Sequence, residues 1–245
     1  MSRDFVCVRL DSYESKEHQE YVRTFLDGRF ENSAFVLLAP DGKEWLSKGS
    51  RGPEMVLGRS RAVERMDTVA ALFPPTADVK QAIMQDFHSV RQALNVASAD
   101  QRVFVIINGP KNQIDPLRES LRAVASNERI VGRFHFDFEE NDDWKTTVEG
   151  TKAEPGIVVI RPGEFGMDGV VMHQLPLDAD NLRVIDTLLA ANADFAKSTE
   201  KKVYSYHVAK GKDRGIYFEG AVPYGEDRDG DGRVDHGGSP RGGGR

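Results

Sequence analysis

The sequence predicts an α/β fold in which a mixed sheet is flanked by helices. Consecutive apolar residues at 103–107 are typical of a central strand that is covered on both faces. Strand-like and helix-like segments alternate through the middle of the chain, which implies parallel pairing. A glycine-rich turn at 163–169 joins two further strand-like segments and predicts an antiparallel hairpin. At 245 residues, the chain is long enough for one or two domains.

The N-terminal part carries two strand-like segments and one helix-like segment. Residues 5–10 form a buried-type strand, and 16–26 an amphipathic helix in which Tyr21 and Phe25 lie one turn apart. Residues 34–38 form a second strand. The turn at 40–43 then leads back to a short extended segment, so a hairpin is expected here.

A helix of about four turns is expected next. Asp78 is a good N-cap, and apolar residues then recur every three or four positions as far as Leu94. The helix therefore leads directly toward the central strand at 103–107.

Two more elements follow that strand. Asp115 and Pro116 supply an N-cap and a first-turn proline for a helix with an apolar face of Leu117, Leu121 and Val124. Phenylalanines then alternate with polar residues at 134–138, which predicts a strand with one buried face.

The last elements are a hairpin and a helix. Strands are expected at 156–160 and 170–172, on either side of the glycine-rich turn. A helix then begins at Asp180, and its apolar stripe is expected to comprise Leu182, Ile185, Leu188, Leu189 and Asn192.

Residues 102–197 resemble a thioredoxin-like domain, whose elements run strand, helix, strand, helix, strand, strand, helix. Glu154-Pro155 stands where that family places a cis-proline, and the sequence leaves the isomer open. Residues 4–72 look like the second half of another such domain, with Ser33 at the position of the proline. This implies a tandem in which the first copy is truncated and lacks its central strand. The missing strand could lie upstream of Met1, could come from another chain, or could be absent altogether, so that the remaining strands form a reduced sheet.

Three segments follow from this resemblance. Residues 1–98 form a partial thioredoxin-like domain with a linking helix, and 99–200 a complete one without redox cysteines. Residues 201–245 form a C-terminal extension.

The cysteines that the thioredoxin-like family uses for disulfide exchange are missing at the expected position. The position of the Cys-x-x-Cys motif reads Asn108-Gly109-Pro110-Lys111-Asn112, and the single cysteine is Cys7. Disulfide exchange needs a low-pKa thiolate and usually a second thiol. A cysteine inside an apolar strand is more often inert than reactive, so redox inactivity is expected.

Two functions remain open. The first is a non-catalytic module that binds a protein or peptide at a groove comprising Asn108, Lys111, Glu154 and Pro155 and at an exposed sheet edge. The second is the C-terminal part of a thiol-disulfide oxidoreductase whose motif lies upstream of Met1. The chain as it stands favours the first, and with it the absence of an enzymatic activity.

The C-terminal segment matches the first nine positions of a calcium loop. The ligands would be the side chains of Asp227, Asp229, Asp231 and Asp235 and the carbonyl of Arg233. Position twelve is Gly238 instead of the usual glutamate. Calcium is the one cofactor that the sequence suggests, with no nucleotide or haem signal; the alternative is a disordered acidic tail.

Charge and hydropathy argue against a nucleic-acid-binding protein and against a membrane-spanning one. A formal charge of -6 argues against nucleic acid as a partner. No apolar run reaches the roughly 18–20 residues that span a bilayer. No signal peptide is recognised, so a soluble, cytoplasmic protein is expected, or an extracytoplasmic one if residues precede Met1.

Overall fold

The computed structural model describes residues 5, 10, 12–13, 15–31, 34–58, 61–74, 87, 89–217, 225, 227 and 230–233. The chain divides into two compact units: unit 1 comprises residues 1–79 and 219–245, and unit 2 comprises residues 80–218. This division differs from the expected segments 1–98, 99–200 and 201–245. The reason is that a helix before residue 100 and another after residue 200 contact the sheet region of unit 2.

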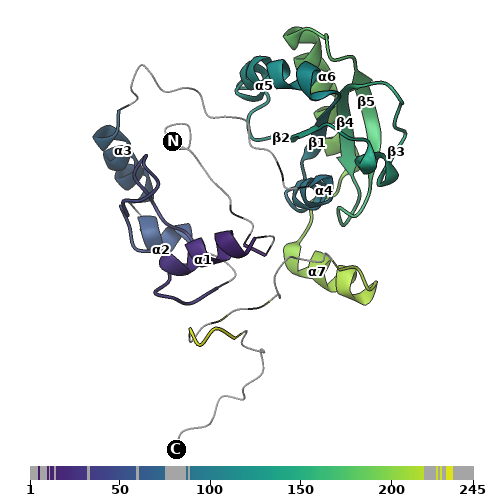
Figure 1. Ribbon diagram of the computed structural model, residues 1–245. Coiled ribbons are helices and arrows are strands. Elements are labelled where there is room, and N and C mark those ends of the chain that lie inside the picture. Colours follow the sequence, from purple (N-terminus) through teal and green to yellow (C-terminus); the bar gives the residue numbers. More distant parts are fainter. Residues whose placement is uncertain are drawn as a thin grey trace, which may run out of the picture. The chain divides into compact units, whose positions relative to one another are not determined.

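Unit 2 contains a mixed sheet of five strands in the order β2-β1-β4-β5-β3 (Figure 1). The strands are β1 Val103–Asn108, β2 Phe134–Glu139, β3 Val148–Glu149, β4 Gly156–Pro162 and β5 Gly169–Leu175. β1 is parallel to β2 and antiparallel to β4, β4 and β5 form the antiparallel hairpin, and β3 is parallel to β5. The expectation of a mixed α/β sheet is confirmed.

Helices cover both faces of this sheet. They are α4 Val90–Ala99, α5 Lys111–Ala125 and α6 Asn181–Ser198, and a further helix, α7 Tyr204–Asp213, follows α6. Buried residues of α5 and α6 share one hydrophobic cluster with the sheet, and buried residues of α4 share another. The sheet is therefore the middle layer of unit 2.

The residues of the central strand β1 are almost all apolar because both faces of the strand are covered. Every residue of β1 is buried. Val105 and Ile107 lie in the cluster with α5 and α6, whereas Phe104 and Ile106 lie in the cluster with α4. Burying each such side chain stabilises the fold by roughly 1.5–3 kcal/mol, so β1 contributes to both cores.

The helix expected from Asp78 to Leu94 is confirmed at residues 90–94 and is wrong at Phe87 and Ser89. Residues 75–86 lie outside the described part of the chain, and Phe87 and Ser89 are not helical. Ser89 is extended, and its Oγ accepts a hydrogen bond from Gln92 N at 3.2 Å. The serine therefore caps α4, which begins at Val90 and continues to Ala99.

The helix expected to begin at Pro116 begins one turn earlier. α5 starts at Lys111 with Pro110 as its N-cap, and Pro116 lies inside it. Ile114 is fully buried on the same face as Leu121 and Val124. Burial of Ile114 favours the extra turn, although Pro116 lacks the N–H that a mid-helix residue donates.

Two further details differ from expectation. The second helix implied by the family resemblance, between β2 and β4, is a 3₁₀ turn at Asp143–Thr146 followed by β3. In α6 the buried stripe is Val184, Leu188, Ala191 and Phe195, whereas Leu182 is 67% exposed. The N-cap at Asp180 is confirmed, since its carboxylate accepts from Arg183 N at 2.9 Å.

Unit 1 has little regular structure in its described residues. Its helices are α1 Lys16–Thr24, α2 Pro53–Leu57 and α3 Ala62–Leu72. The expected hairpin is reduced to isolated bridges that join Phe35 to Ser50 and Leu38 to Trp45. The expected strand at 5–10, with Cys7, lies almost wholly outside the described residues, so the tandem copy stays a hypothesis. Within the described chain, no helix is both long and apolar enough to cross a membrane.

Candidate functional site

The four residues predicted for the binding groove lie at one end of the sheet of unit 2. Asn108 ends β1 and pairs with Gly156 of β4, so Glu154 and Pro155 lie directly beside the end of β1. A Cβ added to Gly109 would lie 3.3 Å from Pro155 Cβ and 3.0 Å from Leu177 Cδ1. We call Asn108, Lys111, Glu154 and Pro155 the β1-end surface.

Asn108 stabilises the loop next to this surface. Its side chain is buried, and Nδ2 donates to the carbonyls of Glu139 at 3.1 Å and Asn141 at 3.0 Å. The amide thereby fixes the loop that follows β2. It has its partners within the protein, so the groups that could meet a ligand are the other three residues.

Lys111, Glu154 and Pro155 are exposed. Lys111 Nζ lies 3.8 Å from Glu140 Oε1, and the Glu154 carbonyl accepts from Gln174 Nε2 at 2.9 Å. The described residues contain no cis peptide bond, so Glu154–Pro155 is trans. The cis-proline of the family resemblance is therefore not found here.

The expected calcium loop is only partly described, and its first ligand already has a cationic partner. Asp227 is 1% exposed, and its Oδ2 lies 2.7 Å from Arg23 Nη1. Its carboxylate also accepts from the amides of Gly230 at 2.8 Å and Gly232 at 3.1 Å. The hydrogen bond from Arg23 is the main cause that lowers the pKa of Asp227.

The other expected calcium ligands give no metal site in the described residues. Asp231 Oδ1 accepts from the amide of Arg233 at 2.8 Å. Asp229 and Asp235 lie outside the described part. Where the structure is described, no three His, Cys, Asp or Glu side chains are placed to hold a metal ion. Arg23 thus supplies a cationic partner to the carboxylate of Asp227.

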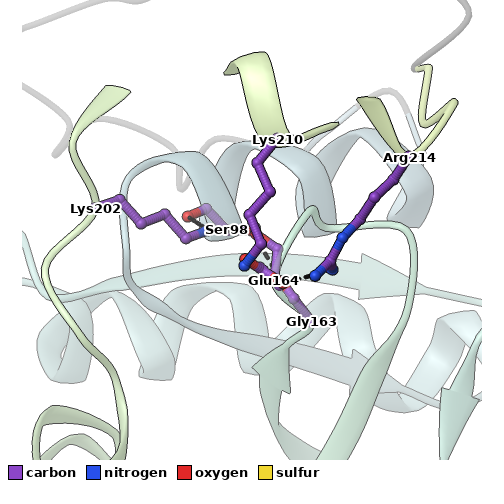
Figure 2. Close-up of polar contacts among 6 residues, drawn as sticks. All are labelled: Ser98, Gly163, Glu164, Lys202, Lys210 and Arg214. Carbon is purple, nitrogen blue, oxygen red and sulfur yellow. Dashed lines mark hydrogen bonds and ion pairs between the residues drawn. The ribbon is translucent and has the colours of Figure 1, made fainter. Parts of the chain in front are cut away.

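A second site, which the sequence did not suggest, lies beside α7. Unit 2 has a cavity of about 560 Å³ lined by the β4–β5 turn, the C-terminal ends of α4 and α6, and α7. We call it the α7 pocket. Figure 2 shows the polar contacts at its wall, which join residues from four separate parts of the sequence.

Lys202 joins three of these parts. Its Nζ donates to the Ser98 carbonyl at 3.0 Å, to Ser98 Oγ at 2.9 Å and to the Glu164 carbonyl. Ser98 Oγ also lies 2.8 Å from the Gly163 carbonyl. A cation at the C-terminal end of α4 is favoured by the helix dipole. Burial lowers the pKa of Lys202.

Glu164 holds α7 against the turn. Its carboxylate pairs with Lys210 and, at 3.1 Å, with Arg214 (Figure 2). The hydrogen bond from Lys210 is the main cause that lowers the pKa of Glu164. Next to this pair, the rings of Phe165 and His207 stack with centroids 4.6 Å apart. Burial lowers the pKa of His207, and Lys202 lowers it further.

The glycine-rich turn fits closely against α4. Gly166 has a φ of 68°, and a Cβ added there would lie 2.5 Å from Asn95 Cα. Asn95 Nδ2 donates to the Phe165 carbonyl at 3.2 Å. The glycines in the sequence indicated this turn. Its packing against α4 and α7 had no sequence signal, because the residues that meet are far apart along the chain.

Comparison with known proteins gives no assignment. No protein family model, curated protein or solved structure matches this chain.

Proposed function

We propose that the chain is a non-catalytic, thioredoxin-like module that binds a protein or an extended peptide at the β1-end surface. The observation that carries this proposal is the arrangement around β1. The strand order β2-β1-β4-β5 is compatible with the family resemblance, and the residues after β1 that would carry the thiols are Asn108 to Asn112.

The chemistry of this surface suits recognition better than catalysis. Asn108 is committed to two backbone carbonyls, and Lys111 and Glu154 supply exposed charges of opposite sign. Pro155 adds an exposed apolar ring next to Glu154. Such a surface can orient a peptide through its charged groups while the ring contacts an apolar side chain.

The outer strand of the sheet offers a second contact. β2 lies at the end of the sheet order, and its carboxyl end is next to Asn108. Extended segments bind readily to outer strands, where they continue the backbone hydrogen bonding. We therefore expect the ligand to be an extended peptide that runs along β2 toward Pro155.

A peptide-display selection on the full chain tests the proposal. Selected peptides should bind the double variant Lys111→Glu, Pro155→Ser at least about tenfold more weakly in fluorescence anisotropy, a typical loss for two central contacts. The matched control is Lys197→Glu, an exposed charge on α6 outside this surface. Peptides that bind the wild type and the double variant equally would contradict the proposal.

A further inference from the structure

We infer that the α7 pocket binds a small organic carboxylate. This site is separate from the β1-end surface and does not depend on the function proposed for it. The cavity volume of about 560 Å³ lies within the range of small-molecule sites, roughly 300–1,000 Å³.

The charges at the pocket divide into satisfied and available groups. Lys202 is held by two carbonyls and a hydroxyl, and Lys210 is paired with Glu164. Arg161 and Lys201 also line the pocket. Within the described chain, neither of these two side chains has a hydrogen bond or an ion pair.

Glu200 is the remaining acidic residue at the pocket. The lining carries four cations, Arg161, Lys201, Lys202 and Lys210, and two carboxylates, Glu164 and Glu200, which leaves an excess of two positive charges in a chain whose net charge is -6. This excess suits an anion. A guanidinium recognises a carboxylate through paired hydrogen bonds, which gives Arg161 the primary role.

Part of the remaining wall is apolar. Phe195 lines the pocket and is 7% exposed, whereas Val203 and Tyr206 are 66% and 71% exposed. A ligand with an apolar or aromatic body could cover these two side chains while its carboxylate meets Arg161. Inorganic phosphate has no such body and could not cover these side chains.

Titration of the ¹⁵N-labelled full chain with benzoate tests the inference. Amide resonances of the linker at 199–203 and of the β4–β5 turn should shift and saturate in the millimolar range or below. Benzamide, the neutral counterpart of benzoate, should give at least about tenfold weaker binding, because it loses the charge-assisted hydrogen bonds.

Variants test whether benzoate binds at the α7 pocket. Arg161→Gln and Lys201→Gln should each weaken benzoate binding about tenfold, as expected for loss of one charged partner. Arg183→Gln, on an exposed position at the far end of α6, should leave it unchanged. The inference is overturned if benzoate gives no saturable shift, if benzamide binds equally well, if inorganic phosphate binds more tightly, or if Arg183→Gln has the same effect as Arg161→Gln.

Discussion

Asn108 illustrates how one residue can shape a surface without contacting the ligand. Its amide donates to two carbonyls of the loop after β2, and it is almost fully buried. Asn108→Ala leaves both carbonyls without this partner. We expect a loss of about 1–3 kcal/mol in the free energy of unfolding. Urea denaturation measures it, with exposed Asn112→Ala as the control. Equal stability of the two variants would contradict the supporting role.

The residues after β1 also predict an outcome in a redox assay. Asn108 to Asn112 contain no thiol, and Cys7 is the single cysteine. The chain should therefore not catalyse insulin reduction by dithiothreitol above the uncatalysed rate, because disulfide exchange needs a reactive thiolate. Turnover that disappears in Cys7→Ser would contradict this, because Cys7 would then be the reactive thiol.

Arg23 makes a specific prediction about calcium. Its guanidinium pairs with buried Asp227, the first residue of the expected calcium loop. Since calcium would have to compete with this charge, Arg23→Gln should bind calcium at least about tenfold more tightly than the wild type. Titration calorimetry measures the difference, and Asp227→Asn serves as the control without the carboxylate. Equal heats for the wild type and Arg23→Gln would show that Arg23 and calcium do not compete.

At the scale of the elements, the position of α7 depends on the ion pairs of Glu164 with Lys210 and Arg214, which are lost when Glu164 is protonated. The pKa of Glu164 is lowered from 4.5, mainly by Lys210, and Arg214, His207 and Lys202 are the other charged groups near it. Because the folded-state pKa is the lower one, the contribution of this contact is complete above about pH 4.5 and is lost as the pH falls through the lowered value.

We therefore expect α7 to loosen on acidification before the sheet does. The amide resonances of α7 in ¹⁵N NMR should move toward random-coil positions below about pH 4.5, and Glu164→Gln should show this state already at pH 7. Asp194→Asn, on the exposed face of α6, is the control. A pH response that persists unchanged in Glu164→Gln would assign it to another group.

The β4–β5 turn gives a prediction with a built-in comparison. Gly166 and Gly132 both have positive φ, but a Cβ meets α4 backbone only at Gly166, whereas it meets nothing within 4 Å at Gly132. Alanine at either site adds backbone strain of about 1 kcal/mol. Gly166→Ala should cost at least about 2 kcal/mol more, because α4 must move. Urea denaturation compares the two, and equal losses would contradict close packing of the turn.

The strands were easier to predict than the helix boundaries. The continuous apolar run of β1 and the glycine turn between β4 and β5 are local signals, and the structure has both elements. The starts of α4 and α5 depend instead on the extended conformation of Ser89 and on burial of Ile114. Burial against a distant sheet is a tertiary effect, and local patterns do not contain it.

The same distinction applies to the two sites. The β1-end surface could be predicted because each of its residues stands next to a recognisable strand or helix end. The α7 pocket could not, because it depends on Lys202 meeting Ser98 and on Lys210 meeting Glu164. These pairs are separated by long stretches of chain, and charged residues of this kind are usually solvated.

At the scale of the whole molecule, the two compact units differ in how they are stabilised. Unit 2 has two hydrophobic clusters, one on each face of its sheet. The described buried cluster of unit 1 centres on Leu37, Val56 and Leu57. Multidomain chains often unfold in more than one step, so the smaller cluster predicts that unit 1 is the less stable unit.

The two tryptophans allow this to be measured, because each unit contains one of them. Trp144 is 4% exposed in the core of unit 2, whereas Trp45 is 47% exposed and contacts Phe25 in unit 1. In the chain labelled with 5-fluorotryptophan, ¹⁹F NMR should follow the two units separately during urea unfolding. The Trp45 resonance should reach its unfolded position at the lower urea concentration.

Leu188→Ala tests whether the units unfold independently. Leu188 is fully buried in the cluster beneath α6, and its truncation should cost about 2–5 kcal/mol. The Trp144 transition should therefore move to lower urea while the Trp45 transition stays in place. Val131→Ala, at a side chain that is 51% exposed in unit 2, should move neither. A shift of both transitions in Leu188→Ala would mean that the two units unfold as one cooperative structure, because loss of a contact in unit 2 would then destabilise unit 1 equally.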